Sequence, residues 1–90
     1  MGLAKKLTIQ NDLGLHARAA AKIVDLARRY RSQVFLKKED HEVDGTSILS
    51  ILTLSCPKGT DIELRTEGED AEVLLEALVR LFEQKFGEDR

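Results

Sequence analysis

The residues best suited to chemistry are His16 and Arg18, which follow Gly14 and precede a run of alanines. Gly14 can adopt backbone angles that other residues avoid, so it can end a strand and redirect the chain. Alanine has the highest helix propensity, and His16 is therefore expected at or just before the first turn of a helix. At that point, N–H groups without an intrahelical partner and the positive end of the helix dipole favour a bound anion.

A neutral imidazole in this position can act as a nucleophile, because the reference pKa of histidine is about 6.5. The planar guanidinium of Arg18 suits a phosphoryl group, which carries close to two negative charges. His16 and Arg18 thus predict phosphohistidine chemistry. The alternative interpretation is a surface or capping histidine beside a solvated arginine. A second histidine, His41, falls in a charged turn and is interpreted as solvated.

The string from Gly14 to Arg18 (Gly-Leu-His-Ala-Arg) resembles the active-site signature of the histidine-containing phosphocarrier (HPr) family of the phosphoenolpyruvate-dependent phosphotransferase system. The resemblance extends along nearly the whole chain. It implies that Nδ1 of His16 carries the phosphoryl group and that Arg18 assists it.

Two positions near the signature depart from the family pattern. Ala19 stands where the family usually has proline, which would pre-set the helical φ in the first turn. Leu13 stands where a polar residue is common, so we expect the capping contact to come from Asp12 or Asn11 instead. Neither change removes a reacting atom.

The composition indicates one small globular domain, residues 1–90. Apolar residues make up 42% of the chain and charged residues 33%, with a formal net charge of −2, which argues against a nucleic-acid binder. No apolar run approaches the ~20 residues of a membrane span. The single cysteine, Cys56, permits no internal disulfide and fits a reducing cytosol. No metal-ligand cluster or nucleotide loop is visible, so neither a metal nor a cofactor is expected.

Hydrophobic periodicity predicts seven elements in the order βαββαβα. The predicted strands lie at 7–10, 33–37, 42–44 and 61–66, and the helices at 17–30, 48–54 and 71–86, the last one capped by residues 68–70. Strands with one polar face favour an antiparallel four-stranded sheet with its helices on one side, an α+β fold. The family resemblance implies the same open-faced sandwich.

Ser47, next to Thr46, is expected to cap the short second helix through its hydroxyl group. The resemblance aligns Ser47 with a serine that a dedicated kinase phosphorylates in some bacteria. A phosphate there would add negative charge beside the surface on which partners dock.

The short helix carries apolar residues on two of its faces, more than a helix with a single buried face would have. At roughly 100° per residue, Ile48, Leu49 and Leu52 gather in one sector, while Ile51 and Leu54 point to the core. The first three predict an exposed patch for a protein partner, and the alternative is that both faces are buried. The resemblance implies that this helix and the active-site loop, including Leu15, dock onto enzyme I and onto sugar-specific EIIA-type acceptors.

These observations predict a monomeric cytoplasmic phosphocarrier without turnover of its own. Enzyme I would phosphorylate His16, which would pass the group to an acceptor histidine of a sugar permease or of the nitrogen-related branch. A regulatory HPr-like module that modulates a kinase or transcription factor is the alternative from another class. A structural domain with an idle histidine is a third possibility.

Overall fold

The structure is a computed structural model that describes residues 2–90 as four strands and three α-helices. A single 3-10 turn follows the last helix. The elements, in chain order, are β1 (Gly2–Thr8), α1 (Ala17–Ala27), β2 (Gln33–Lys38), β3 (His41–Asp44), α2 (Ile48–Leu52), β4 (Asp61–Glu67), α3 (Ala71–Glu83) and η1 (Lys85–Gly87). The predicted βαββαβα order is confirmed.

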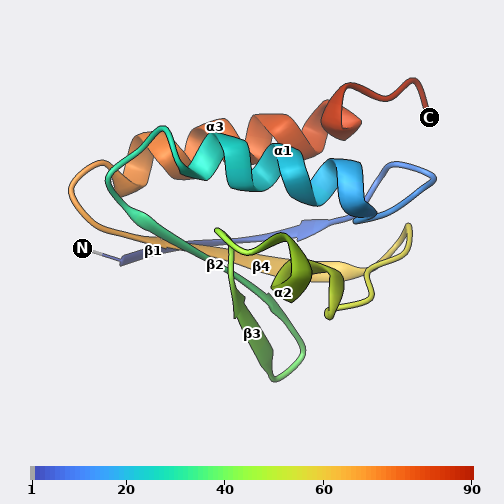
Figure 1. Ribbon diagram of the computed structural model, residues 1–90, viewed down its shortest axis with the longest axis horizontal. Helices are drawn as coiled ribbons and strands as arrows, with labels where there is room; N and C mark the ends of the chain where they lie inside the picture. The colour runs from blue at the N-terminus through green and yellow to red at the C-terminus, as the bar shows by residue number, and fades with distance from the viewer. Residues whose placement is uncertain (1) are drawn as a thin grey trace.

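The strands form one antiparallel sheet in the order β1-β4-β2-β3. Long β4 lies in the middle, where Leu64 pairs with Lys5 of β1 and with Leu36 of β2. Helices α1 and α3 run side by side over one face of this sheet, and α2 lies near its β3 end (Figure 1). The predicted open-faced α+β sandwich is therefore confirmed.

The core lies between this helical layer and the sheet. Strand β4 alternates strictly, so Ile62, Leu64 and Thr66 are buried while the residues between them face outward. The buried residues of α1 and α3 follow the helical period. They are Ala19, Ala20, Ile23, Val24 and Ala27 in α1, and Ala71, Leu74, Leu78 and Phe82 in α3.

Several predicted boundaries were wrong by a few residues. β1 begins at Gly2 and ends before Ile9, which leaves the strand but is still buried. Helix α1 ends at Ala27 rather than at residue 30, α2 ends at Leu52 rather than 54, and α3 ends at Glu83 rather than 86. Residues with left-handed φ, which cannot continue a helix, follow α2 at Ser55 (φ 56°) and α3 at Lys85 (φ 55°).

Asp70, one of the predicted capping residues 68–70, occupies the N-cap position of α3, although its side chain makes no capping hydrogen bond. The carboxylate instead accepts hydrogen bonds from the backbone N–H of Arg31 at 3.0 Å and of Ser32 at 2.9 Å. These bonds tie the start of α3 to the loop between α1 and β2. They also lower the pKa of Asp70, with the Ser32 hydroxyl as the largest cause.

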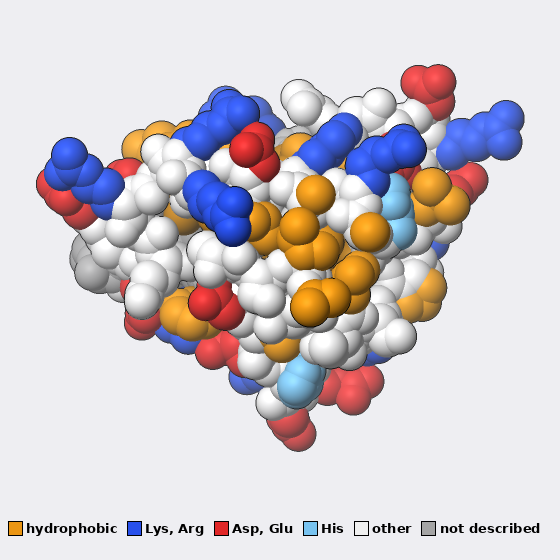
Figure 2. All heavy atoms as spheres, in the orientation of Figure 1, with side chains coloured by type: hydrophobic (Ala, Val, Ile, Leu, Met, Phe, Trp, Pro, Cys, Tyr) orange, Lys and Arg blue, Asp and Glu red, His pale blue; other side chains and the backbone are white. Residues whose placement is uncertain are grey.

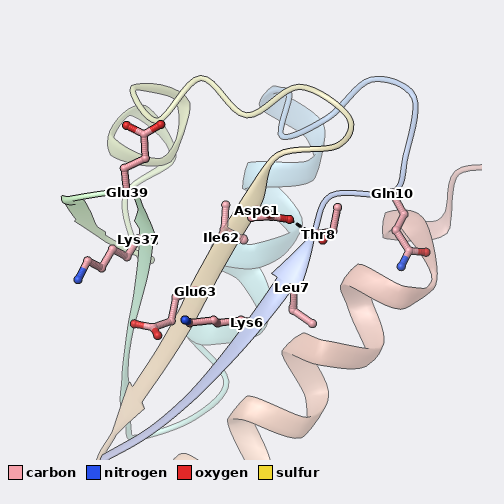
Figure 3. A pocket seen from close by; sticks show the side chains of 9 residues that line it. All are labelled: Lys6, Leu7, Thr8, Gln10, Lys37, Glu39, Asp61, Ile62 and Glu63. Atoms are coloured by element: carbon pink, nitrogen blue, oxygen red, sulfur yellow. Dashed lines mark hydrogen bonds between the residues drawn. The ribbon is translucent and has the colours of Figure 1, made fainter.

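The face of the sheet opposite the helices is open and charged. Figure 3 shows a shallow hollow on it, where Lys6 of β1 and Glu63 of β4 lie side by side near Lys37 of β2. Thr8 and Asp61, which also line the hollow, are joined by a hydrogen bond of 2.7 Å from the Thr8 hydroxyl. None of the residues that line this hollow is a predicted site residue.

Candidate active site

A tight turn at Gly14 delivers His16 to the start of α1. Gly14 has φ +65°, and a Cβ on it would lie 2.3 Å from the backbone oxygen of Cys56. Leu15 then donates its N–H to that same oxygen at 2.8 Å. The left-handed conformation and the close approach both require glycine, as the sequence predicted.

His16 is the N-cap residue of α1, with extended backbone angles of φ −80° and ψ 177°. Its carbonyl accepts the first helical hydrogen bond, from Ala20 at 2.9 Å, and its side chain makes no capping bond. The N–H groups of Ala17, Arg18 and Ala19 therefore meet no acceptor among residues 2–90. The predicted anion-favouring helix start is present beside the imidazole.

A carboxylate from the C-terminal segment holds the imidazole from one side. Nε2 of His16 lies 2.5 Å from Oε2 of Glu88, and the two side chains are 25% and 13% exposed. The pKa of Glu88 is lowered, first by the hydrogen bond to His16 and then by the one from Asn11. Nδ1 of His16 has no hydrogen-bond partner among residues 2–90, so the ring presents this nitrogen for reaction.

Asn11 links the turn to the same carboxylate. Its fully buried side chain donates from Nδ2 to the Gly14 carbonyl at 2.9 Å and to Oε1 of Glu88 at 3.1 Å. The predicted cap by Asn11 or Asp12 was therefore wrong, because neither side chain bonds an N–H of α1. Asp12 instead pairs with Lys58 at 2.8 Å, which lowers the pKa of Asp12.

Arg18 extends from the first turn of α1 into solvent, where its guanidinium makes no ion pair within residues 2–90. Its positive charge is the smallest of the causes that lower the pKa of Glu88. A cation that is not engaged elsewhere is available to an incoming anion. The phosphoryl-stabilising role of Arg18 stays a prediction.

Ser47 caps α2 as predicted, since its Oγ accepts the N–H of Ser50 at 3.2 Å. Leu49 is 77% exposed and Ile48 is 38% exposed, whereas Leu52 is half-buried. The predicted core position of Ile51 is confirmed. Figure 2 shows hydrophobic side chains gathered on the face that carries α2, with basic side chains above them along α1.

Leu15 was predicted to face a partner, and the structure corrects this. Its side chain is only 6% exposed and belongs to the core cluster. The turn at Gly14 points the residue inward, so Leu15 anchors the active-site loop instead of offering surface. Cys56, beside the same turn, is also buried, and burial raises the pKa of its thiol.

Sequence reasoning missed Glu88 altogether. It stands 72 positions from His16, and only the packing of α3 beside α1 brings the two together. The visible signal was an acidic residue directly after Gly87, the expected stop of the last helix. Figure 1 shows the C-terminus and the loop before α1 at the same end of the molecule.

Comparison with known proteins identifies the family of this chain. The family model described as the PTS HPr component phosphorylation site matches residues 3–84. The chain belongs to the PTS HPr family. The resemblance that the signature around His16 indicated is thereby confirmed.

The relatives of this HPr-family chain match it over nearly its full length. The phosphocarrier protein HPr of Pseudomonas aeruginosa is 48% identical over 86 residues, covering 94% of this chain and 96% of the relative. The phosphocarrier protein HPr of Xylella fastidiosa strain Temecula1 is 41% identical over 87 residues, covering 97% and 98%.

Solved HPr structures share the fold. A crystal structure of HPr from Thermoanaerobacter tengcongensis superposes with a TM-score of 0.93 at 39% identity, covering 98% of this chain and 99% of the other. HPr from Bacillus anthracis gives a TM-score of 0.85 at 36% identity, covering 90% and 96%.

Within residues 2–90, no cluster of histidine, cysteine and acidic side chains could hold a metal ion. Over the same range, no helix is long and apolar enough to cross a membrane.

Proposed function

We propose that this chain is a phosphocarrier of the phosphotransferase system, which accepts a phosphoryl group from enzyme I on His16 and passes it to a histidine of an acceptor protein. The observation that carries the proposal is the imidazole at the N-cap of α1, with Nε2 held by Glu88 and Nδ1 unbonded. A nucleophile so placed faces an incoming phosphorus atom with one defined lone pair.

The surroundings of His16 suit the group that it would carry. A phosphoryl group on Nδ1 brings nearly two negative charges to the start of α1. The N–H groups of Ala17 to Ala19 and the helix dipole stabilise negative charge there, and the Arg18 guanidinium can approach from solvent. The group is then held strongly enough to survive between partners and remains exposed enough to leave.

The chain would act as a substrate and relay, with no turnover of its own. Its partners are enzyme I and EIIA-type acceptors in the cytoplasm, and they would dock on the exposed residues Ile48 and Leu49 of α2 and on the half-buried Leu52. An apolar patch of this kind suits partners that bind briefly and must then separate. A kinase acting on Ser47 would place a phosphate at the edge of that patch and weaken docking.

Incubation with enzyme I and phosphoenolpyruvate, followed by intact mass measurement, tests the proposal. The wild type should gain about 80 Da, the mass of an added HPO₃ group, and should lose it in acid. His41→Ala is the matched control and should gain the same mass, whereas His16→Ala should gain none. A wild-type chain that gains no phosphoryl group from active enzyme I would refute the carrier function and would favour a regulatory module.

A further inference from the structure

The C-terminal turn has an unfavourable backbone shape that places Glu88 against the active site. Lys85, Phe86 and Gly87 all have left-handed φ values, of 55°, 56° and 79°. Only the last of them is a glycine, and side-chain-bearing residues avoid this region. The surrounding structure must therefore hold the turn in place.

Two contacts hold it. The Phe86 ring is 1% exposed and packs edge-on against Phe82, with ring centroids 4.8 Å apart. The Phe86 carbonyl accepts a hydrogen bond from Nζ of Lys22, which extends from α1. The turn is thus tied both to its own helix and to the helix that begins at His16.

Beyond the turn, the tail is fastened to the active-site loop. Both carboxylate oxygens of Glu88 are used, one by His16 and the other by the buried Asn11 amide. The N–H of Asp12 donates to the Arg90 carbonyl at 3.1 Å. A carboxylate that is oriented from both sides differs from an ordinary surface ion pair, in which long side chains move freely.

We infer that Glu88 is a positioning residue for phosphoryl transfer at His16, an inference that rests on the proposed function. By accepting the Nε2 proton, its carboxylate fixes the tautomer in which Nδ1 carries the lone pair, and it also fixes the orientation of the ring. Carboxylates behind metal-ligating histidines act in the same way.

The transfer step shows where the charge goes. The Nδ1 lone pair forms the new bond to phosphorus, while the bond from phosphorus to the donor breaks and its electron pair returns to the donor atom. The proton stays on Nε2, so the ring of His16 becomes positively charged. Glu88 lies 2.5 Å from that nitrogen and stabilises this charge. On discharge the same sequence runs in reverse.

Nitrogen-15 NMR of the His16 ring tests the inference without any partner protein. In the wild type, above the pKa of the imidazole, the proton should reside on Nε2 alone. Glu88→Ala should allow a measurable fraction of the Nδ1–H tautomer. Asp89→Asn is the matched control, because Asp89 is the exposed acidic neighbour in the same tail, and it should match the wild type. An amide spectrum of each variant verifies the fold.

The steady-state rate at which enzyme I phosphorylates the chain gives the second readout. Glu88→Ala should lower kcat about tenfold, the smaller effect seen when a carboxylate behind a ligating histidine is removed. The KM for the carrier should stay within about twofold, since α2 is untouched, and Glu88→Asp should restore part of the rate. Asp89→Asn should change neither value.

Three results would overturn the inference: a tautomer in Glu88→Ala equal to that in Asp89→Asn, a changed tautomer with an unchanged rate, or a loss confined to KM. A wild type that takes no phosphoryl group would refute the proposed function instead. The NMR comparison would still report whether Glu88 holds the ring.

Discussion

Leu49 is 77% exposed on α2, while Ile51 in the same helix is fully buried, so glutamate at these two positions should have opposite effects. For this 90-residue domain, a typical stability of 0.05–0.15 kcal/mol per residue amounts to roughly 5–14 kcal/mol. A buried, unpaired carboxylate at Ile51 costs about 4 kcal/mol or more, which removes a large part of that stability. Exposed Leu49→Glu should change the free energy of unfolding by only about 0.5 kcal/mol.

The same two variants should separate folding from docking. If Leu49 lies at the centre of the partner interface, its glutamate variant should lose about 2 kcal/mol of binding, or about 30-fold in affinity. Urea unfolding followed by circular dichroism measures the first effect, and the KM for the carrier with enzyme I measures the second. Val73→Glu is the matched control, because Val73 is 52% exposed but lies on α3. A Leu49→Glu protein that unfolds, or one whose KM equals that of Val73→Glu, would refute the docking assignment.

Three further substitutions test the site. Arg18→Ala should slow the phosphorylation of His16 by enzyme I about tenfold to a hundredfold without abolishing it, because a group that stabilises negative charge is lost while the nucleophile stays. Equal rates for the variant and the wild type would reduce Arg18 to a solvated charge. Ala19→Pro should raise the free energy of unfolding by roughly 0.4–1 kcal/mol, since the Ala19 N–H has no acceptor among residues 2–90. A clear fall in melting temperature would show that the buried position 19 has no room for the proline ring. The hydrogen bonds from His16 and Asn11 lower the pKa of Glu88 from 4.5, so they stabilise the fold above that pH, and this contribution is lost as the pH falls below it. The wild type should therefore lose more stability than Glu88→Gln between neutral pH and pH 3, and parallel unfolding curves would contradict this.

Periodicity was sufficient to predict the order of the elements, because the longer ones carry a clear apolar stripe. Strand β4 alternates over its whole length, and α3 repeats leucine at helical spacing, so tertiary packing did not override either pattern. Periodicity could not predict the strand order, since β1 and β4 are neighbours in the sheet but far apart in the chain. No local pattern encodes that pairing.

The candidate site was predictable only where its residues are close in sequence. Gly14, His16 and Arg18 lie within one turn of chain, and the local rules for helix starts apply to them directly. Glu88 reaches the site because Phe86 packs into the core, and its contact with His16 joins segments 72 positions apart in the chain. The burial of Leu15 likewise depends on where the Gly14 turn meets the backbone of Cys56, which no periodicity reveals.

The most direct test of the carrier function is whether a phosphoryl group on His16 moves on. The chain is charged with enzyme I and phosphoenolpyruvate, separated from both, and mixed with an EIIA-type acceptor. Intact mass should show this chain losing about 80 Da while the acceptor gains the same amount, and His16→Ala, still folded, should transfer nothing. A phosphorylated wild-type chain that keeps its phosphoryl group when mixed with each EIIA-type acceptor of the same organism would contradict the account.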